Sequence, residues 1–131
     1  MWIFTQYGFF SVVNTPAGSD TMTVRSRSRG QLETLVEAFK DDVDHLEDVE
    51  IISYNDPQYG EYWDRDYEHR IILNAEQWVT LAACLASDIT YSNFKSQVSK
   101  ADVPDKYLSR LYRIYVEMED ETRQLSATLI N

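Results

Sequence analysis

The alternation of apolar and polar residues at the start of the chain predicts a β-hairpin. Residues 2–13 are aromatic and β-branched, which favours a strand, and the internal Gly8 indicates a bulge or a bend. Turn-forming residues crowd positions 14–20. Residues 21–27 then alternate with a period of two, as expected of a half-buried strand. Its two faces are Met22 with Val24, and Thr23 with Arg25 and Arg27.

A helix is predicted directly after the hairpin. Ser28 and Gln31 have the spacing of a capping box. Apolar residues then recur at helical spacing as far as Leu46, which predicts a helix over residues 31–46. The opposite face of this helix carries Glu33, Glu37, Asp41, Asp44 and Asp48.

Two more strands and three more helices follow. Strands are predicted over residues 49–54 and 67–73, the latter with Tyr67, His69 and Ile71 on one face, and residues 55–66 read as a turn and a loop. Helices are predicted after Asn74, from Ser92 to Val98 and from Pro104 onward, with a tail from about residue 120 that frays.

The order of elements is therefore ββαββ followed by helices. Consecutive hairpins favour an antiparallel sheet, here of about four strands, with the helices packed on one of its faces. The chain has 131 residues and no internal repeat or linker, so a single α+β domain over residues 1–131 is expected.

Charge and composition narrow the classes of partner. The formal net charge of −10 disfavours direct binding to nucleic acid or to an anionic membrane surface. There is no apolar stretch of about 20 residues and no recognisable signal peptide. The single cysteine, Cys84, excludes an intrachain disulfide. These features predict an acidic, cytoplasmic protein.

Arginines form the first candidate site. Arg25 and Arg27 share one face of their strand and lead into a helix start, where Arg29 lies and where free N–H groups attract anions. Arg70 of the strand at 67–73 extends this patch if it lies on the same face. The alternative is that these guanidinium groups pair with the chain's own carboxylates.

A second candidate is the link between two helices, where Tyr91, Asn93 and Lys95 offer polar groups within one turn. Asn93 and its neighbours can equally serve as helix caps. We expect neither a metal site nor a cofactor, since the acidic run after Phe39 lacks the calcium-loop pattern. Catalytic motifs are missing as well, which predicts a protein that is not an enzyme.

Four separated blocks of the sequence resemble a family of small bacterial proteins without an assigned activity. The blocks are MWIFTQYGFFSVV, TVRSR, DYEHR and DITYSNFK, and they span about three quarters of the chain. The resemblance implies a set of site residues and no function. These residues are Arg25, Arg27, Tyr67, Arg70, Tyr91, Asn93 and Lys95.

Three functional hypotheses follow. The first is a binding protein that acts through a protein interface, as a homodimer over its sheet face, because tyrosine and tryptophan are favoured at interfaces. The second is a binder of small anions or nucleotides that uses the arginines as a cradle. The third is an acidic inhibitor of a nucleic-acid-binding protein, of the kind that phages direct against host defence.

Overall fold

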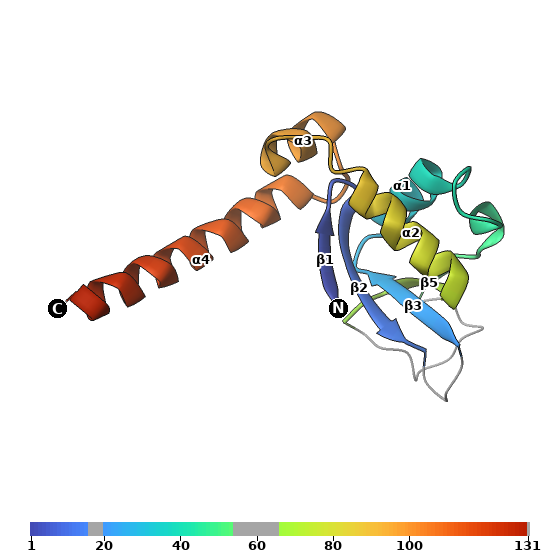
Figure 1. The fold of residues 1–131 in the computed structure, drawn as a ribbon, viewed down its shortest axis with the longest axis horizontal. Coiled ribbons are helices and arrows are strands. Elements are labelled where there is room, and N and C mark those ends of the chain that lie inside the picture. The colour runs from blue at the N-terminus through green and yellow to red at the C-terminus, as the bar shows by residue number, and fades with distance from the viewer. Residues whose placement is uncertain (16–19, 54–65, 131) are drawn as a thin grey trace.

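The protein is built on one antiparallel sheet of five strands in the order β1-β2-β3-β5-β4 (Figure 1). A computed structural model describes the backbone of residues 1–15, 20–53 and 66–130, and the side chains as far as Glu119. The strands are β1 (Trp2–Thr5), β2 (Gly8–Asn14), β3 (Thr21–Ser26), β4 (Ile52–Ser53) and β5 (His69–Asn74). The helices are α1 (Arg29–Phe39), the short 3-10 helix η1 (Leu46–Asp48), α2 (Ala75–Ser87), α3 (Phe94–Ala101) and α4 (Tyr107–Ile130).

The α+β class with an antiparallel sheet is confirmed, but the sheet has five strands where four were expected. The difference lies in the first segment, which is two strands joined by a tight turn at residues 6–7. The Thr5 hydroxyl accepts hydrogen bonds from the backbone N–H groups of Tyr7 and Gly8, at 3.1 Å each. Gly8 has a φ of +147° and begins β2, so the predicted bend is a full reversal of the chain.

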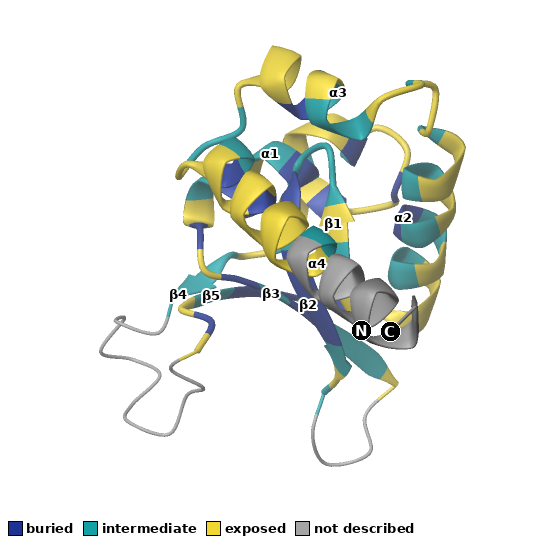
Figure 2. Cartoon of the chain, turned by 90° about the vertical axis from the view of Figure 1, so that its left-hand side faces the viewer, coloured by how far each residue is buried: buried dark blue, intermediate teal, exposed yellow. Residues whose placement is uncertain are grey.

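The main core lies between one face of the sheet and the helices α1 and α2 (Figure 2). The strand register places Val24 opposite both Val12 and Ile71, and Met22 opposite Leu73, so these apolar side chains share that face. The face predicted for Met22 and Val24 is therefore the core face. Arg25 lies on the other face, as the alternation predicts.

Helix α1 ends at Phe39, seven residues before the predicted end at Leu46. Val43 and Leu46 are nevertheless buried in the core, because the chain continues in turns and η1 after the helix. His45 adopts a left-handed conformation with a φ of 61°, which a continuous helix does not allow. Asp41 and Asp44 therefore do not extend an acidic helical face, which weakens the basis of the inhibitor hypothesis.

Several other boundaries differ from those predicted. The strand at 49–54 contracts to β4, and α3 is capped by Asn93 rather than Ser92. Helix α4 begins three residues after Pro104 because Asp105 and Lys106 have positive φ angles. It then continues to Ile130, through the segment for which a fraying tail is predicted. The predictions for residues 16–19 and 54–65 lie outside the described residues.

Helices α3 and α4 form a second, smaller cluster. Val98, Tyr107 and Leu111 are buried together and pack against Phe9, which lies on the sheet face opposite the main core. Beyond these first turns α4 extends away from the sheet and from the other helices (Figure 1). Among the described residues, no helix combines the length and the hydropathy that a membrane span requires.

The pairing of β4 with β5 depends on a partly buried histidine. The two strands share two residue pairs, Ile52 with Arg70 and Ser53 with His69. The Ser53 hydroxyl lies 2.9 Å from the His69 ring nitrogen Nδ1. Burial lowers the pKa of His69 below its ordinary value of 6.5, more than the nearby Glu68 carboxylate raises it.

We predict that acidification below pH 6.5 weakens this edge of the sheet. The unfolded chain binds the His69 proton at a higher pH than the folded chain does, so stability rises with pH between the two pKa values. His69 therefore contributes fully above about pH 6.5 and progressively less as the pH falls toward its folded pKa. Urea unfolding from pH 5 to 7.5 measures this slope, and His69→Gln should flatten it. An unchanged slope in the variant would assign the pH dependence to other groups.

Candidate anion-binding groove

Tyr67 is the centre of the arginine cluster. Its side chain is 6% exposed, and the guanidinium carbons of Arg25 and Arg27 lie 4.6 Å and 5.3 Å from the centre of its ring. Contacts of this kind contribute about 0.5–2 kcal/mol each, depending on how far the cation is desolvated. The ring thus contacts two guanidinium groups in a chain with a large excess of acids.

Arg70 joins this cluster from the neighbouring strand. Arg25 and Arg70 are direct cross-strand partners, so their side chains emerge on the same face, which the sequence had left open. Arg25 Nη2 donates a hydrogen bond to Ser11 Oγ at 2.7 Å, and Arg70 Nη2 donates to the Tyr67 carbonyl at 3.4 Å. Arg70 is 9% exposed. It is therefore largely withheld from solvent, and it bonds the backbone of Tyr67.

The predicted orientation of Tyr67 is wrong. Alternation placed it on the face of His69 and Ile71, but β5 begins only at His69 and Tyr67 precedes the strand. The period of two applies only within a strand, so the Tyr67 ring is free to turn to the arginine face, where it contacts Arg25. This turn explains why a tyrosine predicted to share the face of His69 and Ile71 instead supports a charged surface.

A groove of about 440 Å³ opens between this cluster and the root of α4. Its volume is within the range of small-molecule sites. Aromatic side chains from the sheet form one wall, and α4 forms the other. The lining includes Trp2, Phe4, Phe9, Arg27, Tyr67, Tyr107, Arg110, Arg113 and Ile114. We call this feature the basic groove.

Three arginines give the basic groove its charge. Arg27 follows β3, whereas Arg110 and Arg113 come from successive turns of α4. Arg27 Nε donates a hydrogen bond to the Asp66 carbonyl at 3.0 Å. Within the part of the chain that the structure describes, none of the three forms an ion pair with a carboxylate. The groove thus concentrates positive charge in a protein of net charge −10.

One carboxylate, that of Asp105, also lines the groove. It accepts a hydrogen bond from the hydroxyl of Ser28, the residue that caps α1. The chain therefore places its own acid beside the helix start where the sequence predicted an anion. Arg29 is likewise occupied, since it pairs with Glu33 and donates to Ser53. Arg29 therefore pairs with the chain's own carboxylate, which is the alternative to anion binding that the sequence left open.

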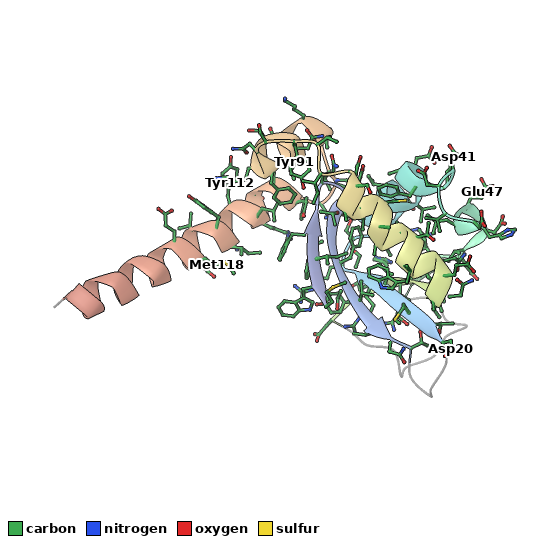
Figure 3. The ribbon with its side chains drawn as sticks, in the orientation of Figure 1. Asp20, Asp41, Glu47, Tyr91, Tyr112 and Met118 are labelled. Carbon is green, nitrogen blue, oxygen red and sulfur yellow. The ribbon has the colours of Figure 1, made fainter. Side chains whose placement is uncertain are left out.

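Tyr91, Asn93 and Lys95 lie apart from the arginine cluster. Asn93 Oδ1 caps α3 by accepting from Ser96 N at 2.9 Å. The Lys95 ammonium lies 4.0 Å from the ring centre of Tyr115 and 5.3 Å from that of Tyr112, both on α4. Tyr91, at the link between α2 and α3 (Figure 3), lines a separate cavity of about 270 Å³. The seven predicted residues therefore form two groups.

The second group adjoins a polar cluster beneath the β1–β2 turn. Gln6 Nε2 donates to Asp88 Oδ2 at 2.8 Å, and the Tyr7 hydroxyl donates to the same carboxylate oxygen. Burial and this carboxylate raise the pKa of Tyr7 well above its ordinary value. These bonds fasten the end of α2 to the sheet, which accounts for the cluster without a ligand.

Sequence reasoning missed several groove residues. Trp2 and Phe4 share one face of β1, so their spacing indicates an aromatic face. Arg110 and Arg113 are three residues apart on one helix, so their spacing indicates a basic face. Nothing in the sequence indicated that α4 passes beside β1. Among the described residues, no three His, Cys, Asp or Glu side chains gather in a way that suits a metal ion.

Comparison with protein-family models, curated proteins and solved structures finds no match to the chain. The resemblance to the small bacterial family accordingly stays a prediction. The candidate site therefore rests on the geometry of the basic groove alone.

Proposed function

We propose that this protein is a non-enzymatic binding protein whose basic groove holds a small anion bearing a flat ring, the chemistry of a nucleotide. The observation that carries this proposal is the set of Arg27, Arg110 and Arg113, which line an aromatic groove without an ion pair among the described residues. Guanidinium groups bind phosphate by charge-assisted and often bidentate hydrogen bonds.

The aromatic wall of the basic groove suits the flat ring of such a ligand. Trp2 is 69% exposed and Phe4 is 42% exposed, and Phe4 stacks on Phe9 with ring centres 4.7 Å apart. Base–aromatic stacking contributes about 1–3 kcal/mol per base in nucleic-acid complexes. The net charge of −10 opposes a long polyanion, which favours a small ligand over DNA or RNA.

The chemistry of the described side chains supports binding without catalysis. Burial raises the pKa of the Cys84 thiol, so the thiolate needed for nucleophilic attack is disfavoured. Burial also raises the pKa of the groove residue Tyr107, whose hydroxyl donates to the Thr5 carbonyl at 2.7 Å. This hydroxyl stays protonated at neutral pH and has a structural partner.

Thermal unfolding with a ligand panel tests the proposal. The panel holds the mono-, di- and triphosphates of adenosine, guanosine, cytidine and uridine, with nucleosides, phosphate and pyrophosphate as controls. A ligand at 100 times its Kd adds about 2.7 kcal/mol of stability, which raises the Tm of a domain of this size by about 10 °C. At least one nucleotide should raise the Tm more than its nucleoside does and more than pyrophosphate does. If no nucleotide shifts the Tm, the groove does not bind this class of ligand.

A protein interface is the second candidate function. It is favoured by the exposed apolar side chains of α4, which the nucleotide proposal does not use. A cytoplasmic location fits both candidates and stays a prediction from the sequence.

A further inference from the structure

The projecting part of α4 exposes large apolar side chains. Tyr107 and Leu111 anchor its first turns in the smaller core, but Tyr112, Ile114, Tyr115, Val116 and Met118 are each more than a third exposed. Figure 3 shows Tyr112 and Met118 on the part of the helix that leaves the body. Most helices in proteins owe their stability to packing of an apolar face. A projecting helix with this surface therefore calls for a partner.

Charge along α4 reverses at its middle. Arg110 and Arg113 lie in its first half, and Glu117 and Glu119 follow within two turns. The sequence adds acids at positions 120 and 121 and an arginine at position 123, so the second half of the helix stays net negative. Two parallel copies of such a helix would oppose like charges, whereas two antiparallel copies oppose arginines with carboxylates. The helix is thus complementary to itself in one orientation only.

The apolar spacing fits the same arrangement. The exposed Tyr112, Tyr115 and Met118 recur every three residues, so they form a stripe along one side of the helix. A two-fold axis near Val116 lies about 14 Å from the start of α4 at 1.5 Å per residue. Each helix would then pass the other antiparallel, with the two sheets at opposite ends of the pair.

We propose that α4 is the dimerisation element of this protein and that its partner is the α4 helix of a second copy, packed antiparallel. The seam is formed by the exposed apolar residues, and the arginine turn of each helix meets the carboxylate turn of the other. This proposal shares Arg110 and Arg113 with the basic groove, but its apolar residues Tyr112, Tyr115 and Met118 lie outside the groove. It also moves the predicted homodimer contact from the sheet face to α4.

Charge-swap complementation tests this proposal by sedimentation and light scattering. The wild-type chain should have twice the 15.3 kDa mass of one copy. The variants Arg110→Glu/Arg113→Glu and Glu117→Arg/Glu119→Arg should each be monomeric and retain wild-type circular dichroism. A one-to-one mixture should restore the dimer, because opposite charges then meet again across the seam.

Other outcomes overturn the proposal. Weak association becomes visible at a concentration on the order of 200 µM. A wild-type chain that is still monomeric at this concentration excludes α4 as a dimerisation element. A dimer that survives both charge swaps, or a mixture that stays monomeric, excludes the antiparallel pairing. The Glu117→Arg/Glu119→Arg variant leaves the basic groove intact, so its nucleotide response separates failure of the dimer from failure of the binding site.

Discussion

Tyr67→Ala lowers the free energy of unfolding by about 3 kcal/mol and removes the nucleotide response, whereas Tyr67→Phe retains most of both. The ring is 6% exposed and packs near Phe9, with ring centres 6.4 Å apart, so its truncation leaves a cavity. The same truncation removes the surface on which the guanidinium groups of Arg25 and Arg27 lie. Urea unfolding and nucleotide titration measure the two effects.

Tyr67→Phe is the matched control because it keeps the ring and deletes only the hydroxyl. If both variants lose binding equally, the hydroxyl contacts the ligand and the ring is not what organises the arginines. If Tyr67→Ala binds nucleotide as the wild type does, Tyr67 has no part in positioning Arg27.

Gly8→Ala destabilises the protein by about 3 kcal/mol, for two reasons. Gly8 has a φ of +147°, a conformation that strains any residue with a Cβ. A Cβ at this position would lie 2.5 Å from Gln31 Oε1 and 2.8 Å from Gln31 Cβ. Gln31 ties three parts of the fold together, since its amide accepts from Phe9 N and donates to the Pro104 carbonyl, at 3.0 Å each.

A double-mutant cycle separates strain from collision. Gln31→Ala removes the colliding Oε1 and Cγ atoms but keeps Cβ. Gly8→Ala should therefore cost less in that background than in the wild type, with the Cβ contact and the backbone strain remaining. Gly30→Ala is the control. Its gain in helix propensity of about 1 kcal/mol is opposed by a 3.1 Å approach of the new Cβ to Pro104 Cβ. We therefore expect a small net change in the free energy of unfolding. A Gly8→Ala variant as stable as the wild type contradicts the described turn.

The sequence predicted the elements whose pattern repeats over several residues. The alternation of Met22 and Val24 placed the core face of β3, and the apolar period placed α1 and α2. Both signals are local, because they follow from the geometry of a strand or a helix. The strand count was wrong because a turn of two residues at Gln6 and Tyr7 leaves almost no mark on a run of aromatic residues.

The residues of the site were predicted only in part, because only positions within a strand or a helix have a local pattern. Arg25 and Arg70 lie within strands, so alternation gives each a face of its own strand, but only the pairing of β3 with β5 brings the two to the same face. Tyr67 lies just outside β5, so periodicity gave it the wrong face. Arg110 and Arg113 belong to the groove through the tertiary path of α4, which the contact of Tyr107 and Leu111 with Phe9 determines. Such a contact between distant residues has no local signature.

The central claim is that the arginines of the basic groove bind an anion, and a matched pair of charge deletions tests it most directly. Calorimetric titration with the nucleotide that gives the largest thermal shift compares Arg27→Gln/Arg110→Gln/Arg113→Gln with Arg29→Gln, whose side chain pairs with Glu33 outside the groove. Each charged hydrogen bond contributes about 1.5–3 kcal/mol, so the triple variant should lose at least about 100-fold in affinity. Arg29→Gln should bind as the wild type does. Equal affinities of the triple variant and the wild type would contradict the claim.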